Sequence, residues 1–333
     1  MVVVSPPPDP VSTPSRPAAP RAGRRDAGRR RGVGKRFLVV EDVLDGVLVQ
    51  TTAATTWVHD PSAVIRHRPV GAAGNAATWL GWLGAEVDLV TRVGVDDVLR
   101  HERSLAAAGV RAHVRYDACT PTGALVSVRN DEGRTTMSDP AAGGALCADD
   151  VPGDLVTRAD IVHLTGAAML GGGGGGIGGG AERIADLVTR ARSGGARVSL
   201  DPSSAAVVRA IGSGAAIAAL AGVDVLFPNV SEALALSGAP RLPEALRRLT
   251  EVVPLVVVTT GADGAVVGRA GRSPLRVPAV PTEAVDTVGV GDAFAAGFLR
   301  AWATDPVRVG SAAREGTRLA ARALGFVGGR RPV

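Results

Sequence analysis

The chain has 333 residues, of which 46% are hydrophobic and 3% aromatic, and it carries a formal net charge of +5 at pH 7. This length and composition indicate a globular protein of enzyme size, with one large α/β core or two modest ones. No run of about 18 apolar residues predicts a membrane span, and no apolar segment follows the N-terminal arginines as in a secretory signal. Cys119 and Cys147 occur without a CxxC pattern and the five histidines form no cluster, so we expect a cytoplasmic protein without a protein-built metal cage.

The positive charge lies in an N-terminal tail, residues 1–36. This tail holds nine lysine and arginine residues against two aspartates, so the rest of the chain is slightly acidic. Because it is rich in proline, alanine and arginine and lacks apolar periodicity, we expect it to be disordered. It fits either an arm for nucleic acid or a membrane surface, or an extension from a start codon placed too early.

From Phe37 onward, short β-branched runs alternate with helical patterns. The expected strands are 36–50, 86–94, 196–202, 223–229 and 254–261. The expected helices are 72–84, 181–195 and 231–238, with Ser231 as the N-cap of the last. This alternation predicts βαβ units and a largely parallel sheet, whose ligands bind beyond the carboxyl ends of the strands.

Two segments, 45–70 and 112–138, break the alternation and look β-rich. The second has a hairpin pattern that turns at Asp131-Glu132-Gly133. Together they predict a small sheet that projects over the main sheet as a lid. The glycine run at 171–180 predicts a mobile loop, because glycine loses the most entropy on ordering.

The stretch AVDTVGVGDAFAAGF, residues 284–298, carries the main chemical signal. A Walker A loop is excluded because the only lysine in the chain is Lys35, and a GxGxxG fingerprint is excluded because Phe294 stands at the third glycine. What remains is a helix N-terminus at Gly289, Val290 and Gly291, whose backbone N–H groups and dipole favour an anion.

Asp292 lies beside this anion site, where its charge would repel a bound phosphate. One interpretation is a first-turn carboxylate that the helix dipole stabilises. The other is a base that takes the proton from a hydroxyl attacking a phosphoryl group. The segment by itself leaves both interpretations open.

The same stretch resembles the second signature of the ribokinase-like (PfkB) carbohydrate kinases, D-T-x-G-A-G-D-x-F, whose positions are here Asp286, Thr287, Gly289, Val290, Gly291, Asp292 and Phe294. The resemblance implies a ribokinase-like α/β domain over 37–333, with a mostly parallel sheet covered by helices on both faces and a small β-sheet lid. It also implies that ATP and Mg²⁺ serve to phosphorylate a hydroxyl of a small sugar or sugar-like substrate. The backbone of 289–291 would be the anion hole and Asp292 the base.

Further segments resemble nucleotide-site motifs of that family. In PNVSE, Asn229 and Glu232 would help to place Mg²⁺ and phosphates, with Glu232 acting on the metal indirectly. Taken alone, Glu232 equally fits a first-turn helix carboxylate. The other nucleotide-binding residues that the resemblance implies are Thr259, Gly261, Gly264, Asp286 and Thr287. Some members of the family also need a monovalent cation near the position of Asp286.

The substrate side carries both matches and departures. The resemblance assigns Asp45 in VLDGVLV, and Gly71 and Asn75 in PVGAAGNAA, to substrate binding. Val70 replaces the first glycine of the family's pair, and VDDVLRH (95–101) replaces the usual G-D-D-x-x-G turn. Specificity is therefore the property that transfers least from the family to this chain.

Alternative functions follow from these departures. One is a nucleoside kinase of the adenosine type, and another is a regulatory sugar- or nucleotide-binding protein with weak catalysis. A nucleic-acid partner for the tail is disfavoured by the acidic body. The exposed strand edges of the lid also suggest a homodimer.

Overall fold

Short runs of buried, mostly apolar residues build a nine-stranded sheet in this computed structural model. The structure describes residues 34–51, 62–130, 133–166, 180–202 and 204–330. Most of the expected tail, the hairpin turn at Asp131 and Glu132, and all but the last residue of the glycine run lie outside these ranges. The strands, in spatial order, are β13 (Leu275–Val277), β12 (Ala265–Gly268), β11 (Leu255–Thr259), β10 (Val225–Leu226), β9 (Arg197–Asp201), β8 (Ile161–Thr165), β1 (Arg36–Val40), β4 (Glu86–Gly94) and β5 (Val110–Asp117).

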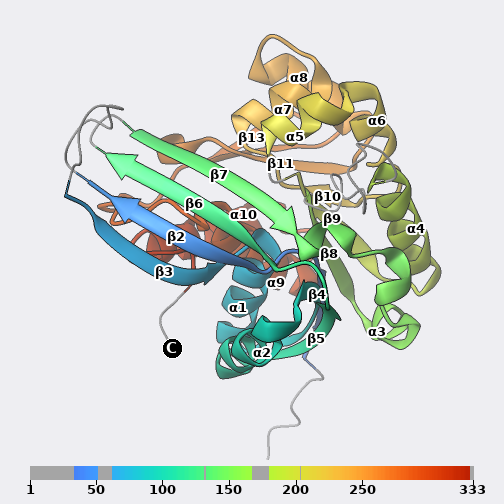
Figure 1. Cartoon of the computed structure of the whole chain (residues 1–333). Coiled ribbons are helices and arrows are strands. Elements are labelled where there is room, and N and C mark those ends of the chain that lie inside the picture. Colours follow the sequence, from blue (N-terminus) through green and yellow to red (C-terminus); the bar gives the residue numbers. More distant parts are fainter. Residues whose placement is uncertain (1–33, 52–61, 131–132, 167–179, 203, 331–333) are drawn as a thin grey trace, which may run out of the picture. The chain divides into compact units, whose positions relative to one another are not determined.

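Neighbouring strands from β11 to β5 run parallel, while β12 and β13 are antiparallel at one edge (Figure 1). Parallel strands need crossover connections, and most of these are helices. The helices are α1 (Ala72–Trp82), α2 (Val98–Ala107), α3 (Gly153–Arg158), α4 (Gly180–Ser193), α5 (Ala205–Ile211), α6 (Ser213–Ala218), α7 (Val230–Ser237), α8 (Leu242–Thr250), α9 (Val290–Thr304) and α10 (Val309–Ala323).

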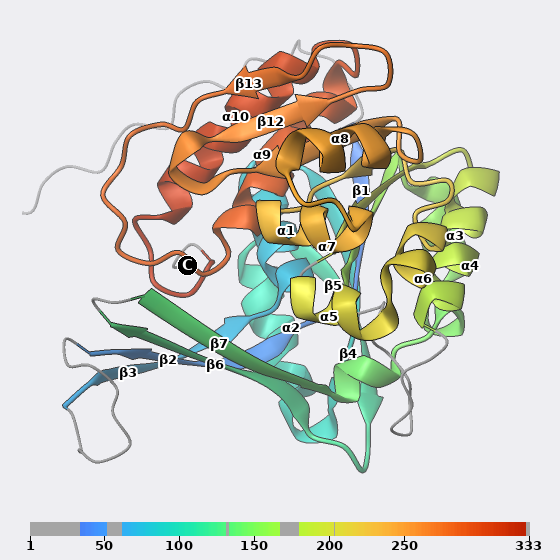
Figure 2. The ribbon, with the colours of Figure 1, turned by 90° about the horizontal axis from the view of Figure 1, so that it is seen from above.

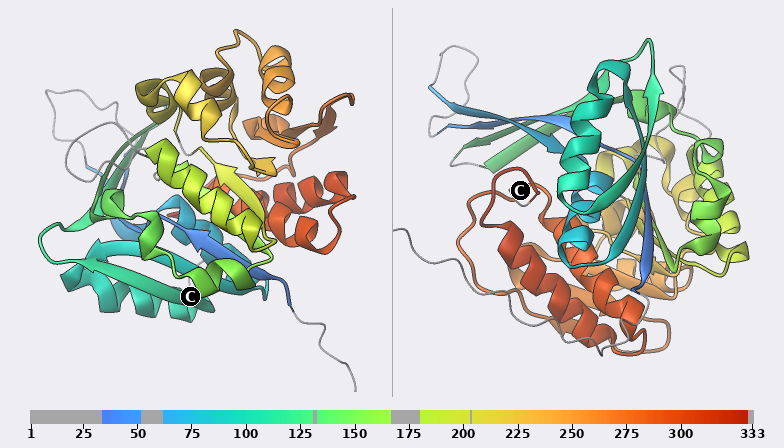
Figure 3. Two further views of the ribbon diagram at one scale, coloured as in Figure 1. Left: turned by 90° about the vertical axis from the view of Figure 1, so that its right-hand side faces the viewer. Right: turned by 90° about the horizontal axis from the view of Figure 1, so that it is seen from below.

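Side chains that alternate along each strand serve two hydrophobic cores. In β1, Phe37 and Val39 pack with α1, α2, α9 and α10, whereas Leu38 and Val40 pack with α3 to α8. Figure 3 shows these two groups of helices on opposite faces of the sheet. The predicted α/β fold with helices on both faces is confirmed.

A four-stranded sheet forms a second layer beside the large one (Figure 2). Its strands, in spatial order, are β3 (Val64–Val70), β2 (Leu44–Gln50), β6 (Thr122–Asn130) and β7 (Gly133–Ala141). β2 and β6 run parallel, and the outer pairs are antiparallel. The inner residues Leu44, Leu48 and Val70 pack against Val288, which attaches this sheet to the loop before α9.

Several boundaries differ from the sequence predictions. The run 36–50 is two strands in two sheets, because the chain turns after Val40 with Glu41 at φ 125°, a region that is unusual for a residue other than glycine. The β-rich segment 112–138 begins inside β5, which pairs with β4 in the large sheet. The run 223–229 has only two strand residues, Val225–Leu226.

The predicted cap of the helix at 231–238 is also wrong. α7 begins at Val230, and its N-cap is Asn229 rather than Ser231. The Asn229 side chain accepts a hydrogen bond from the backbone of Glu232 at 3.0 Å, a contact that fixes the start of the helix earlier than the hydrophobic run suggests. Among the described helices, none is long and apolar enough to cross a membrane.

Candidate active site

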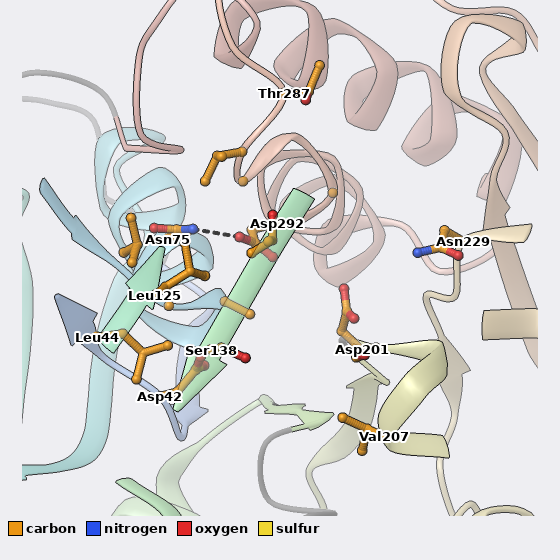
Figure 4. A pocket seen from close by; sticks show the side chains of 18 of the residues that line it. Asp42, Leu44, Asn75, Leu125, Ser138, Asp201, Val207, Asn229, Thr287 and Asp292 are labelled. Atoms are coloured by element: carbon orange, nitrogen blue, oxygen red, sulfur yellow. Dashed lines mark hydrogen bonds between the residues drawn. The ribbon is translucent and has the colours of Figure 1, made fainter. Parts of the chain in front are cut away.

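A cavity of about 410 Å³ opens where the carboxyl ends of the parallel strands meet the N-termini of α1, α7 and α9. Asp42 follows β1, Asp201 ends β9 and Thr259 ends β11, and all three line the cavity. The small sheet contributes Leu44, Leu125, Arg134, Thr136 and Ser138 from its side. Figure 4 shows Asp292 between the groups that the two sheets supply.

Asp292 lies in the first turn of α9 and lines the cavity. Asn75 of α1 donates a hydrogen bond from Nδ2 to Oδ2 of Asp292 at 2.7 Å (Figure 4). Gly289, the N-cap, has φ 72°, and a Cβ there would lie 2.4 Å from Cα of Gly329. Only glycine fits this position, because both the backbone conformation and the space exclude a side chain.

The expected anion hole and the carboxylate therefore stand at one helix end. Gly289 and Gly291 line the cavity, and Val290 between them is the first residue of α9. The free N–H groups of this first turn carry the positive end of the helix dipole. A phosphoryl group at this end and a hydroxyl beside Asp292 would share one cavity.

The cavity is strongly acidic. Burial, followed by the negative charge of Asp201, raises the pKa of Asp292 to about 8, with a further contribution from Asp42. The hydrogen bond from Asn75 and the positive charge of Arg330 act in the opposite direction. Burial also raises the pKa of Glu232 to about 7, and Asp292 adds to that shift. This surplus of carboxylates fits Mg²⁺, which proteins hold through one or two carboxylates together with phosphate oxygens.

Asn229 and Glu232 cap a helix, and both also line the cavity. They form a reciprocal capping box at α7, in which the backbone N–H of Asn229 donates to the Glu232 carboxylate at 2.8 Å. Asn229 Nδ2 also donates to Glu232 at 2.6 Å. The capping box therefore fixes the positions of two polar side chains at the wall of the cavity.

Three more of the expected nucleotide residues lie at the end of β11 and in the turn that follows it. Thr259 lines the cavity, and its N–H donates to the carbonyl of Pro228 at 3.0 Å. Gly261 and Gly264 form the following turn, beyond the residues that line the cavity. Gly264 has φ 96°, and a Cβ there would lie 2.1 Å from the carbonyl oxygen of Val277.

Asp286 and Thr287 have different positions. Thr287 lines the cavity, whereas Asp286 is buried. The Asp286 carboxylate accepts backbone hydrogen bonds from Thr287 at 2.7 Å, Val288 at 3.1 Å and Gly328 at 3.0 Å. Asp286 therefore organises the loop before the anion hole.

On the substrate side, Gly71 and Asn75 line the cavity, whereas Asp45 lies elsewhere. Asp45 pairs with Arg100 at 2.6 Å and lines a separate cavity with Arg68 and His101. The candidate active-site cavity is lined instead by Asp42, in the turn between β1 and β2. Its Oδ1 accepts a hydrogen bond from the backbone N–H of Ala73 at 3.1 Å. Its signal in the sequence is its place directly after the buried run of β1.

Sequence reasoning also missed Asp201, Arg134 and Arg330. Asp201 follows the rule that residues at strand ends face the ligand, and it could have been found in that way. Arg134 is the one positively charged residue among the described residues that line the cavity. Arg330 follows the last helix in the sequence, where no pattern marks it.

Comparisons with known proteins agree with this geometry. The family model described as pfkB family carbohydrate kinase matches residues 47–332. A 1-phosphofructokinase from Rhodobacter capsulatus is 33% identical over 261 residues, which cover 76% of this chain and 79% of the relative. An ATP-dependent ribose-1-phosphate kinase from Halopiger xanaduensis is 32% identical, over 71% of this chain and 73% of the relative.

Solved structures show the same fold. A chain from E. coli, described as a ribokinase II and solved in complex with ATP and Mg²⁺, matches with a TM-score of 0.75. The match covers 89% of this chain and 94% of that one at 21% identity. At this identity the likeness concerns the fold alone.

Proposed function

Because this chain belongs to the pfkB family of carbohydrate kinases and is a sugar or nucleoside phosphotransferase, we propose that Asp292 is its general base. The observation that carries this proposal is the position of Asp292 in the first turn of α9, beside the cavity-lining amides of Gly289 and Gly291. In phosphoryl transfer, positioning and electrostatic stabilisation provide most of the rate acceleration. Asp292 would remove the proton of the attacking hydroxyl while the helix end stabilises the charge on the transferred group.

We propose ATP as the phosphoryl donor and Mg²⁺ as its metal. The E. coli neighbour solved with both ligands and the acidic cavity of this chain support this assignment. When bound, Mg²⁺ would neutralise charge on the phosphates of ATP. Asn229 and Glu232 would hold this ion through water and phosphate oxygens. Thr259 and Thr287 would contact the nucleotide inside the cavity, and Gly261 and Gly264 would contact the part of it that extends beyond the cavity. We also propose a cytoplasmic location, because the ATP that the reaction would use is available there.

A monovalent cation near Asp286 belongs to the same proposal. The Asp286 carboxylate already receives three backbone N–H groups, so a cation there would bind chiefly through carbonyl oxygens of the surrounding loops. Titration of the activity with K⁺ against a bulky organic cation at constant ionic strength tests the requirement.

We infer that the acceptor carries an anionic group in addition to its reactive hydroxyl. Arg134 is an exposed residue of β7 that lines the cavity, and none of the ion pairs among the described residues involves its guanidinium. The carboxylates Asp42, Asp201 and Asp292 would repel an anion from their own end of the cavity. An acceptor with a phosphate or carboxylate would therefore place this group at Arg134. The names of the two relatives, which contain phosphorylated sugars, support the same class.

The test of this function is ADP release with ATP and Mg²⁺ across pentoses, ketohexoses, sugar acids, nucleosides and sugar phosphates. We expect a sugar phosphate or sugar acid to give the highest kcat/KM. The Arg134→Met variant should raise KM for that acceptor about tenfold, as expected for loss of a charge-assisted contact, and leave KM for ATP unchanged. If a neutral sugar or a nucleoside reacts best, and Arg134→Met has no effect, the anionic class is wrong. If nothing stimulates ADP release while ATP binds, the regulatory alternative is the better one.

The domain and subunit arrangement is part of the proposal. We assign the kinase domain to 37–333 and the lid to the small sheet. The outer strands of this small sheet, β3 and β7, expose Val64, Ile65 and Met137. Unpaired strand edges with apolar side chains favour pairing with a second copy of the chain. Light scattering of the purified protein tests the dimer, which a purely monomeric mass would contradict.

A further inference from the structure

The segment after α10 returns to the active site and packs beneath it. The backbone of Gly328 donates to Asp286 at 3.0 Å, and Trp79 Nε1 of α1 donates to the carbonyl of Gly329 at 2.8 Å. Phe326 packs against the Trp79 ring, with 6.2 Å between ring centroids. These contacts bring Arg330 into the interior, where its residue surface is 8% exposed.

Arg330 makes two hydrogen bonds inside the site. Its Nε donates to Asn75 Oδ1 at 3.1 Å, and its Nη2 donates to the carbonyl oxygen of Val70 at 2.7 Å. The space for this guanidinium comes from Gly74, where a Cβ would lie 2.1 Å from Nη2. Arg330, Asn75 and Asp292 thus form one chain of hydrogen bonds.

The chemistry of the guanidinium determines how Asn75 is oriented. Arginine is only a donor, so the amide of Asn75 must turn its oxygen towards Arg330. Its Nδ2 then faces Asp292 and donates to Oδ2. If the amide turned over, its oxygen would face the carboxylate and repel it, and two donors would face each other at Arg330.

The charge of Arg330 acts in the same place. Three carboxylates interact with Asp292: Asp42 after β1, Asp201 at the end of β9 and Glu232 in α7. Asp201 and Asp42 raise the pKa of Asp292, and Asp292 in turn raises the pKa of Glu232. Arg330 is the cation whose attraction opposes them. Its burial strengthens this attraction, because water screens it little.

We infer that Arg330 is a positioning residue for the general base: it holds the Asn75 amide so that Asn75 donates to one oxygen of Asp292 and leaves the other oxygen to the acceptor hydroxyl. This inference rests on the proposed role of Asp292. It adds a residue 255 positions from Asn75, outside the stretch that resembles the family signature.

The test compares the pH dependence of kcat in the wild type, Arg330→Met and Arg330→Lys, with Arg318→Met as the control. Arg318 is an exposed arginine of α10 that pairs with Glu315. Arg330→Met should lower kcat about 10- to 100-fold, because a misplaced catalytic group loses this much. It should also move the acidic limb of the profile up by about one pH unit, since an opposite charge is removed. KM for ATP should stay within about twofold of the wild type.

Arg330→Lys separates the two effects of the guanidinium. Lysine keeps the charge but not the planar fork, so the acidic limb should stay in place while kcat falls. Arg318→Met should match the wild type in both. The inference would be overturned if Arg330→Met keeps the kcat and the pH profile of the wild type, whether or not its thermal stability changes.

A third variant covers the case in which Arg330→Met does not fold. Gly74→Ala places a methyl group against the guanidinium and should reproduce the upward shift of the acidic limb. If Gly74→Ala and Arg330→Lys both keep the wild-type kcat and profile, the inference is wrong. If the wild type itself shows no acceptor-dependent ADP release, it is the proposed function that has failed instead.

Discussion

At the scale of single residues, the site depends on one carboxylate that its surroundings pull in two directions. Burial and the neighbouring charges of Asp201 and Asp42 favour the protonated form of Asp292, whereas Asn75 and Arg330 favour the ionised form. A base whose pKa lies near the working pH serves catalysis best, because it is both available and strong enough to take the proton. Asn75 and Arg330 therefore offset part of the increase in the pKa of Asp292 that the neighbouring carboxylates cause.

The pH dependence of the activity follows from this balance. Asp292 must be ionised to accept a proton, and its pKa is raised to about 8, so kcat/KM should increase with pH through the neutral range and level off above about pH 8. Asp292→Asn should lose this limb along with most of its activity. A profile that stays flat from mildly acidic to mildly alkaline pH would contradict the assignment of Asp292.

At the scale of elements, helix N-termini and strand ends place nearly every group of the site. Asn229 illustrates this dual use, since it caps α7 and lines the cavity. Asn229→Ala should lower the free energy of unfolding by about 1 kcal/mol through loss of the cap. It should also raise KM for ATP. Chemical denaturation and initial-rate kinetics measure the two effects.

The matched variant Asn229→Ser separates capping from ligand binding. Serine is as good an N-cap as asparagine, so the stability that the cap provides should stay near that of the wild type. Serine lacks the Nδ2 group that donates to the Glu232 carboxylate at 2.6 Å, so KM for ATP should still rise. If Asn229→Ser binds ATP as the wild type does, Asn229 acts only as a helix cap.

The turn after β11 offers a second pair of variants. Gly264→Ala should destabilise the protein by about 2 kcal/mol or more, because φ is 96° and a Cβ would meet the carbonyl oxygen of Val277 at 2.1 Å. Gly261 has φ 65°, and no atom of the described residues around it lies within 4 Å of the place that a Cβ would take, so Gly261→Ala should cost about 1 kcal/mol. Equal melting temperatures for the two variants would contradict this difference.

Many of the helix and strand positions could be predicted from the sequence. Long, strongly patterned elements such as α1, β4 and β11 lie where periodicity places them. The errors occur where a tertiary contact overrides a local pattern. The run 36–50 divides because its second half pairs with β6 rather than with the large sheet, and Asn229 caps α7 because Glu232 returns the hydrogen bond.

The candidate site was predictable to the extent that it lies on one continuous motif. Gly289, Gly291 and Asp292 are neighbours in the chain and meet at one helix end. Asp45 was assigned by resemblance, whereas the turn after β1 directs Asp42 into the cavity instead. Arg330 could not be predicted, because no local pattern says that a segment after the last helix returns to Asn75.

At the scale of the whole molecule, residues 34–333 form a unit that contains every group assigned to the site. Removal of residues 1–33 should therefore leave kcat and KM close to those of the full chain. Parallel kinetics of the full chain and the shortened chain measure this, and a large loss of activity would show that the basic tail takes part in the reaction. A filter-binding assay with DNA and RNA at increasing salt tests its alternative role as a nucleic-acid arm.

The central claim is that Asp292 takes the proton of the acceptor hydroxyl during transfer of the phosphoryl group. The most direct measurement is the rate of a single turnover with saturating ATP, Mg²⁺ and the best acceptor, for the wild type and Asp292→Asn. We predict a fall of about 10²–10⁴ in rate, as removal of a general base produces, with unchanged affinity for ATP. A variant that transfers the phosphoryl group as fast as the wild type would contradict the claim.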